Sequence, residues 1–300
     1  MATDARAEAP LRNSPGRRLA AFLYRRPRLQ LGLLLSAPLG WLAIAYLGSL
    51  TVLFVAAFWR LDPFTAEVVH DYGLQNFKLL WENDVYRTIT VRTVAIAAAV
   101  TVTDAALAFP IAYYIAKVAS PRTRNLLLVA ITMPLWASYL VKVYAWRLIL
   151  QEEGVLNWAL APFGLHGPGF GNVAMWLVFS YLWLPFMIIP IYAGLQRIPN
   201  SLLEASSDLG ARTGRTFRSV VLPISLPAVV AGSIFTFSLT LGDYITPRLV
   251  SNNQFIGNVV YDNVGVANNL PLASAFATVP VLIMIGYLLA ARRLGAFESL

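Results

Sequence analysis

The sequence predicts an all-α protein that crosses a membrane six times, and three observations lead to this fold class. Apolar residues make up 58 % of the 300-residue chain, whereas soluble proteins average about 45–50 %. Only 13 % of the residues are charged, which leaves too little polar surface to cover a water-facing globule. The apolar residues also fall in six long runs, each near the ~20 residues that a helix needs to cross a bilayer.

The six runs are nearly continuous in apolar content and lack the alternation of a barrel strand. Prolines inside several of them are expected to kink the helices, because neighbouring helices can satisfy the freed carbonyl groups. The first run is too long for the apolar part of a signal peptide and is predicted to be retained. The predicted spans are Leu31–Phe58, Thr88–Ala116, Asn125–Leu150, Val173–Leu195, Ser225–Val250 and Ala273–Ala290.

The distribution of Lys and Arg predicts the orientation of these spans. Arginines are frequent before the first span, between the fourth and fifth, and after the sixth, whereas the loops Gln151–Asn172 and Ser251–Leu272 contain no Lys or Arg. Short loops rich in Lys and Arg stay in the cytoplasm. We therefore expect a multi-pass protein in the lipid bilayer with both termini in the cytoplasm.

Composition and motifs exclude several other classes of function. The net charge of +8 comes from basic residues that cluster between the apolar runs, so no nucleic-acid-binding face is expected. The chain has no cysteine and only two histidines, His70 and His166, which form no ligand pair, so no metal site is predicted. It contains no G-x-x-x-x-G-K-[ST], H-E-x-x-H or G-x-S-x-G motif. The chain is therefore not expected to be an enzyme, and any ATP must be bound by another chain.

The third predicted cytoplasmic connection, residues 197–223, has the pattern of a helical elbow. Ser201 and Glu204 fit the S-x-x-E capping box that starts a helix, and leucines follow at helical spacing. Gly210 can end this helix, because glycine adopts the left-handed conformation without strain. Arg212 opens a second piece, which Leu222-Pro223 is expected to stop at the membrane.

This loop resembles the EAA loop of the permeases of binding-protein-dependent ABC importers. Glu204-Ala205-Ser206, Gly210 and Val220-Val221-Leu222-Pro223 match E-A-A, three residues, G, nine residues, I-x-L-P, with Ser206 and Val220 as mild departures. In that family the loop is the coupling helix that seats on the ATPase subunit. The resemblance assigns this role to Glu204, Ala205, Ser206, Asp208, Gly210, Arg212, Leu222 and Pro223.

Three further runs resemble spermidine/putrescine-type permeases: Leu135–Trp146, Tyr181–Met187 and Leu241–Pro247. The resemblance implies a MetI-like type I importer fold with a tail at 1–27, a first helix and outer loop at 28–87 and a permease core at 88–294. It implies a bacterial inner-membrane location, no cofactor bound by this chain, and four kinds of partner. These are a second permease that forms a heterodimer, two ATPase subunits that hold ATP and Mg, an extracytoplasmic substrate-binding protein and lipid.

Buried acids and aromatic side chains are the candidates for a polyamine pathway. Asp104 and Asp243 lie inside predicted spans, where an ionisable side chain is expensive and is usually functional. Trp136, Tyr139 and Trp146 recur at helical spacing and are predicted to share one face of the third span. Aromatic rings hold an ammonium group by cation–π contacts of about 0.5–2 kcal/mol each. Tyr244 is added because it follows Asp243 directly.

Each candidate also has a structural interpretation. Asp104 could be hydrogen-bonded between helices beside Thr101 and Thr103, and Trp146 could be an interfacial anchor. Asp243 could pair with Arg248, Lys142 or Arg147. The substrate could instead be an opine or an amino-acid derivative, and a secondary transporter is the alternative from another class, although no internal repeat supports it.

Overall fold

The structure, a computed structural model, describes residue 22 and residues 24–293. The chain forms two compact units, residues 1–55 and 56–300. The tail predicted for residues 1–27 lies almost wholly outside the described residues. The first unit holds α2 (Pro27–Leu42), a π-helical turn (Ala43–Leu47) and most of α3 (Gly48–Ala56). Together these segments form one long apolar helix whose side chains are nearly all exposed, as expected for a helix that faces lipid or another chain.

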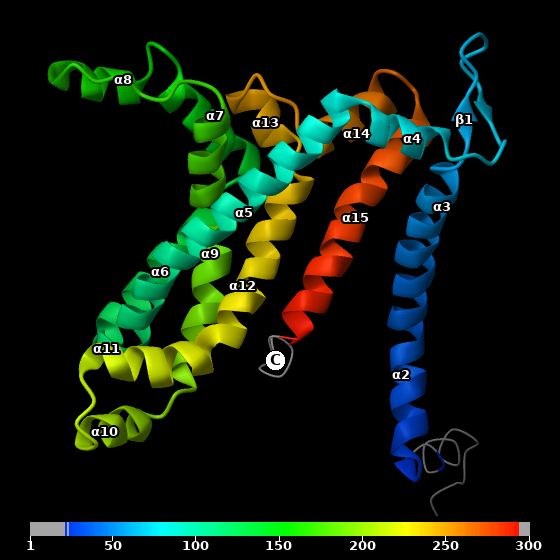
Figure 1. The fold of residues 1–300 in the computed structure, drawn as a ribbon. Helices are drawn as coiled ribbons and strands as arrows, with labels where there is room; N and C mark the ends of the chain where they lie inside the picture. The colour runs from blue at the N-terminus through cyan, green and yellow to red at the C-terminus, as the bar shows by residue number, and fades with distance from the viewer. Residues whose placement is uncertain (1–21, 23, 294–300) are drawn as a thin grey trace, which may run out of the picture. The chain divides into compact units, whose positions relative to one another are not determined.

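The second unit is a helical bundle built on α5 (Asp84–Tyr113), α9 (Asn172–Gln196) and α12 (Leu222–Gly242), which pack against one another (Figure 1). A short antiparallel hairpin of β1 (Arg60–Leu61) and β2 (Val68–Val69) precedes them. The remaining helices are α4 (Gln75–Glu82), α6 (Pro121–Trp136), α7 (Tyr139–Leu150), α8 (Val155–Leu160), α10 (Asn200–Asp208), α11 (Thr213–Thr216), α13 (Ile245–Val250), α14 (Ile256–Gly265) and α15 (Leu270–Arg293).

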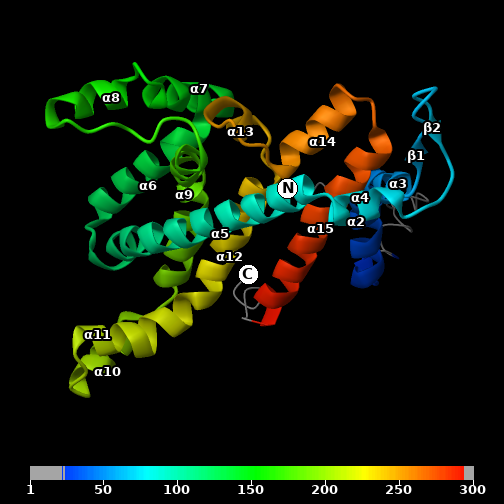
Figure 2. The same ribbon diagram turned by 45° about the horizontal axis from the view of Figure 1, so that its top comes forward.

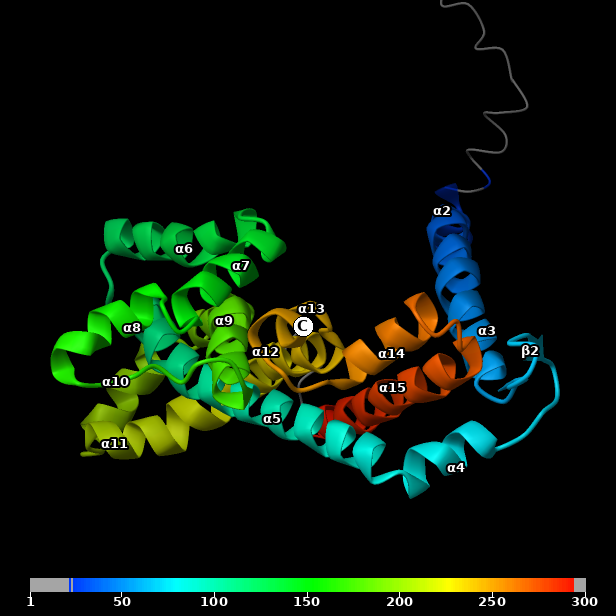
Figure 3. The same cartoon turned by 90° about the horizontal axis from the view of Figure 1, so that it is seen from above.

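The two ends of this unit carry different helices. The short helices α8, α13 and α14 gather at one end, and α10 and α11 lie at the other (Figures 1 and 2). Viewed from above, α12 and α13 lie between the α6–α7 pair and the α14–α15 pair (Figure 3). The end with α10 and α11 is the one that the distribution of arginines predicts to be cytoplasmic.

The contact between α9 and α12 depends on two glycines. A Cβ atom at Gly194 would lie 2.4 Å from the Cβ of Ala228, and one at Gly232 would lie 3.2 Å from the backbone of Met187. Small residues let helices approach closely in a membrane, where packing and not the hydrophobic effect drives helix association. The two helices are therefore in close contact at two positions along their length, at Gly194 and at Gly232.

Five helical stretches of the described chain are long and apolar enough to cross a membrane, and the pair α6–α7 provides a sixth span only if it is counted as one. This confirms the predicted all-α, polytopic architecture, in which the bent pair α6–α7 takes the place of the third of the six predicted spans. A continuous third span at Asn125–Leu150 is wrong, because α6 and α7 are bent by 91°. Ala137 and Ser138 are extended, with ψ of 144° and 134°. The break follows Pro134, which has no N–H to donate to the helix.

The fifth span also differs from the prediction of one helix over Ser225–Val250. A single helical stretch runs from Thr213 to Gly242, and the chain leaves the helix at Asp243–Tyr244 before α13 begins. Pro223 does not stop the helix. A π-helical turn at Phe217–Val221 comes directly before it, and a wider turn accommodates a proline whose ring would clash in a regular α-helix.

The capping box predicted at Ser201 and Glu204 is not formed. Helix α10 starts two residues earlier, at Asn200, after an extended Pro199 with ψ of 142°, and no side chain caps it. The end of α10 is as predicted. Gly210 has φ of +75°, and the N–H groups of Gly210 and Ala211 donate to the carbonyl oxygens of Ser207 and Ser206, which is a Schellman motif.

The close approach of α9 and α12 generates a stability prediction. The substitution Gly194→Ala should destabilise the protein by about 1–3 kcal/mol, because the added methyl group forces the two helices apart. The measurement is the thermal midpoint of the purified protein in detergent. Gly286→Ala in α15 is the control, since its Cβ would meet nothing within 4 Å and alanine favours a helix. Equal midpoints for the two variants would contradict the prediction.

Candidate functional site

Two breaks in the helices meet inside the second unit. One is the bend between α6 and α7 at Ala137–Ser138, and the other separates α12 from α13 at Asp243–Tyr244. Helix α13 packs against both α7 and α9. Non-helical backbone within a membrane is tolerated only where it is buried in protein or lines a water-filled cavity. The meeting of two breaks therefore marks a candidate site.

Asp243 connects the two breaks. Its carboxylate accepts hydrogen bonds from the backbone N–H groups of Ile245 (2.8 Å) and Thr246 (3.1 Å) and from the Thr246 hydroxyl (3.1 Å). The hydroxyl of Tyr139, the first residue of α7, is the fourth donor. A carboxylate has about four acceptor positions, so Asp243 is fully satisfied here. It caps α13 and holds that helix to α7.

None of the basic partners considered for Asp243 is among its four donors. Arg248 pairs instead with Asp262 at 3.3 Å, and Arg147 lies over the ring of Phe170 at 5.9 Å. The part played by Thr246 was missed from the sequence. The signal for it is the D-x-x-T spacing, in which an acid satisfies the N–H groups that start a helix.

The aromatic candidates separate into different places. Tyr139 stacks on Trp183 of α9 with ring centroids 6.0 Å apart, and Trp146 contacts Tyr181 at 5.4 Å. Trp136 ends α6 and is 90 % exposed, so the face predicted to join Trp136 to Tyr139 is wrong, because the chain bends between them. Tyr244 stacks on Tyr261 of α14 at 4.8 Å. Tyr139 and Asp243 are thus brought together, and Trp183 joins them.

Asp104 lies in α5 and is completely buried. Neither of its oxygens has a hydrogen-bond partner among the described residues. The threonines beside it are engaged elsewhere. The Thr101 hydroxyl donates to Ala97 within its own helix (2.7 Å), and the Thr103 hydroxyl accepts from the indole N–H of Trp176 (3.0 Å).

The elbow at the opposite end presents one face of α10 to the outside. Leu203 packs inward against buried Ile198 and Phe217, and the hydroxyls of Ser206 and Thr216 lie 2.9 Å apart and share a hydrogen bond. The residues left on the outer face are exposed. They are Glu204, Ala205, Asp208 and Leu209, and we call them the outer face of α10.

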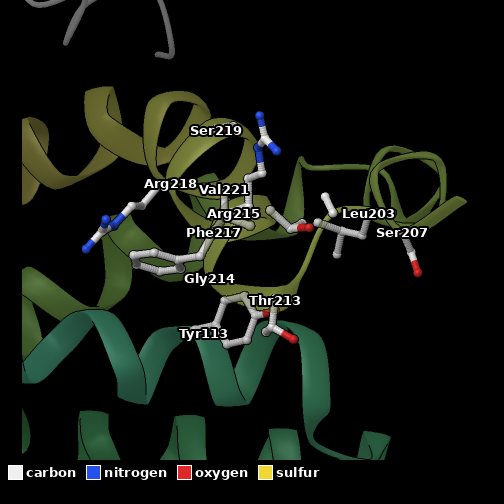
Figure 4. A pocket seen from close by; sticks show the side chains of 12 residues that line it. Tyr113, Leu203, Ser207, Thr213, Gly214, Arg215, Phe217, Arg218, Ser219 and Val221 are labelled. Atoms are coloured by element: carbon white, nitrogen blue, oxygen red, sulfur yellow. The ribbon is translucent and has the colours of Figure 1, made fainter. Parts of the chain in front are cut away.

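A groove of about 930 Å³ lies beside this elbow (Figure 4). Tyr113 near the end of α5, Leu203 of α10, and Thr213 and Phe217 after the glycine line it. The elbow is also tied to the π-helical turn Tyr114–Val118, which follows α5. The ammonium group of Lys117 donates to the carbonyl oxygen of Ile198 (2.6 Å) and lies 3.5 Å from the side-chain oxygen of Asn200. Lys117 was not among the residues singled out from the sequence.

The remaining members of the predicted coupling set lie on the second arm of the elbow. Arg212 comes directly before α11 and is exposed. Leu222 and Pro223 begin α12 and are exposed as well. The whole set therefore flanks one turn of the chain at one end of the bundle.

Comparison with known proteins agrees with this architecture. The family model of the binding-protein-dependent transport system inner membrane component matches residues 108–296. The inner membrane ABC transporter permease protein YdcU of Escherichia coli (strain K12) is 44 % identical over 98 % of both chains. The spermidine/putrescine transport system permease protein PotB of Haemophilus influenzae is 28 % identical over 67 % of this chain and 72 % of its own.

Solved structures share the fold. A chain of a bacterial alginate ABC transporter, solved in complex with its alginate-bound periplasmic protein, matches with a TM-score of 0.74 at 16 % identity, over 94 % of this chain and 98 % of that one. A chain of the MetNI methionine ABC transporter matches with a TM-score of 0.51 at 17 % identity, over 73 % and 99 %. Given the family model that matches more than half of its residues and the full-length identity to YdcU, this chain belongs to the inner membrane components of binding-protein-dependent transport systems and is an ABC importer permease.

Proposed function

We propose that this permease moves polyamines such as spermidine and putrescine, or a related amine, into the cytoplasm. The observation that carries the proposal is the cluster of Asp243, Tyr139 and Trp183 at the meeting of two helix breaks. A carboxylate beside aromatic rings suits an alkylammonium group, which gains charge pairing and cation–π contacts. The identity to PotB, a spermidine/putrescine permease, supports the same substrate class.

In this proposal a bound ammonium group and the contact between α7 and α13 are alternatives. All four acceptor positions of Asp243 are occupied, so an ammonium group must replace a donor to reach the carboxylate. The Tyr139 hydroxyl is the donor that comes from another helix. If the ammonium group replaces this donor, α7 is released from α13. The substrate would then bind the released conformation more tightly and shift the bundle toward it.

We further propose that the outer face of α10 docks on an ATPase subunit, which binds ATP and Mg²⁺. Leu209, 88 % exposed, would be an apolar anchor, with Glu204 and Asp208 beside it. Helix α10 connects α9 to the helical stretch that ends at Gly242, directly before Asp243, and the glycine contacts hold these two helices together. A push on α10 would therefore reach the substrate cluster.

The proposed assembly contains this chain, a second and different permease, two ATPase subunits and an extracytoplasmic binding protein. The alginate transporter, which shares the fold, was solved in complex with a periplasmic protein. We infer from the arginines near α10 and α11 that this end lies in the cytoplasm, by the positive-inside rule, so the end with α8 and α14 would meet the binding protein.

The substrate proposal is tested by uptake of labelled putrescine and spermidine in cells that lack this gene. The wild-type gene should restore uptake. Asp243→Asn should insert normally but lower uptake at least about tenfold, because an amide keeps the shape and loses the charge that holds a cation. Glu153→Gln, which changes an exposed acid of an outer turn, is the matched control and should transport normally.

If deletion of the gene leaves polyamine uptake unchanged, the substrate proposal fails, and opines and amino-acid derivatives are screened next. If uptake persists without ATP hydrolysis, the chain operates as a secondary transporter and the proposed assembly fails.

The coupling proposal is tested with Gly210→Val. Valine cannot readily adopt the φ of +75° at this position, so α10 should end differently and the outer face should be displaced. We expect a complex that assembles and hydrolyses ATP but imports substrate at least about tenfold more slowly, as small misplacements do in coupled sites. The measurement is the ratio of transport to hydrolysis in proteoliposomes, with Gly286→Ala as control. A wild-type ratio for Gly210→Val would contradict the role of the elbow.

A further inference from the structure

Three buried polar side chains near the middle of the bundle have no hydrogen-bond partner. Asp104 of α5 is 0 % exposed, and Ser180 and Trp183 of α9 are each 9 % exposed. Both oxygens of Asp104, the Ser180 hydroxyl and the Trp183 indole N–H are unpaired among the described residues. Helices α5 and α9 pack against each other, and the Ser180 hydroxyl lies near the Asp104 carboxyl group without forming a hydrogen bond to it.

The position of Asp104 makes these unpaired groups expensive. By the rise of an α-helix it lies about 20 Å from the end of its span at Val118, deep in a hydrocarbon layer of about 30 Å. The ion pairs formed by the described residues involve Arg60, Arg87 and Arg248, and none includes Asp104. A purely structural role would require partners for the carboxyl group, which this conformation does not supply.

The unpaired groups adjoin the cluster around Asp243. Ser180 and Trp183 are three residues apart on α9 and therefore lie on one side of that helix. Trp183 also stacks on Tyr139, whose hydroxyl donates to Asp243. Tyr139 and Trp183 thus connect the fully paired carboxylate of Asp243 to the side of α9 that carries Ser180.

We propose that Asp104, Ser180 and Trp183 form a second binding site for an ammonium group, which opens when α5 and α9 separate during transport. This inference rests on the proposed function and deepens it. The Asp104 carboxylate would balance the charge, the Ser180 oxygen would accept an N–H of the ammonium group, and the Trp183 ring would offer its face. Two acidic sites that share Trp183 suit a substrate with two or more ammonium groups.

The test uses the complete importer in proteoliposomes, with labelled putrescine as the probe. Asp104→Asn should lower the kcat of putrescine import at least about tenfold. Asp104→Glu, which retains the charge, should recover part of the lost rate. Ser180→Ala should lower the rate less than Asp104→Asn does.

A stability measurement separates this role from a structural one. Asp104→Leu keeps the branched shape of the side chain and removes the unpaired polar group, so its thermal midpoint in detergent should equal or exceed that of wild type, while import is lost. A lower midpoint that accompanies the loss of import would overturn the inference in favour of a structural role. Wild-type import by Asp104→Asn would overturn it as well, with the proposed function intact. If wild type imports no amine, the proposed function fails first.

Discussion

Within a bilayer every backbone N–H and C=O group must find its partner inside the protein, and the rest of this structure depends on how Asp243 meets that constraint. The chain leaves the helix at Asp243–Tyr244, and the N–H groups that begin α13 would otherwise be unpaired. The Asp243 carboxylate accepts from two of them and also from Tyr139, at the start of the helix that follows the other break. One side chain thus stabilises two discontinuous helices and places a carboxylate where a cation could compete for it.

The same logic explains how an exposed elbow can act on this buried cluster. A loop without contacts to the bundle could not pass a movement on to it, whereas α10 is held by two contacts. Lys117, in the π-helical turn after α5, donates to the carbonyl oxygen of Ile198 before α10, and Ser206 of α10 shares a hydrogen bond with Thr216 after Gly210. Ser206 is also the position at which the sequence departs from E-A-A, and its hydroxyl has a partner that an alanine could not use. Because α9 and α12 are in close contact at their glycines, we expect a displacement of α10 to move both helices together.

Much of the fold follows from local sequence. Apolar run length predicts the spans, and Gly210 predicts the end of α10, because a glycine after an amphipathic run satisfies the helix terminus by itself. The bend at Ala137–Ser138 does not follow, since Pro134 is one of several prolines in the spans and the others, Pro185 and Pro190 among them, lie within a continuous helix. Whether a proline ends a helix depends on what tertiary contacts offer the freed groups. Tyr139, just after the bend, bonds to Asp243, 104 residues away, and no periodicity of the sequence reveals this contact.

The candidate site shows the same division between local and distant information. The sequence identifies Asp104 and Asp243 as acids within predicted spans, but it does not distinguish them. It shows only that each lies in an apolar run and does not reveal which side chains contact it. The structure separates them by their partners. Asp243 is satisfied and supports the fold, so its carboxylate is available to a substrate only through a change in the contacts of α7. Asp104 is unsatisfied and supports nothing in this conformation. A bundle that retains such a group is less stable than one with an apolar residue there, and proteins keep that kind of defect where activity requires it.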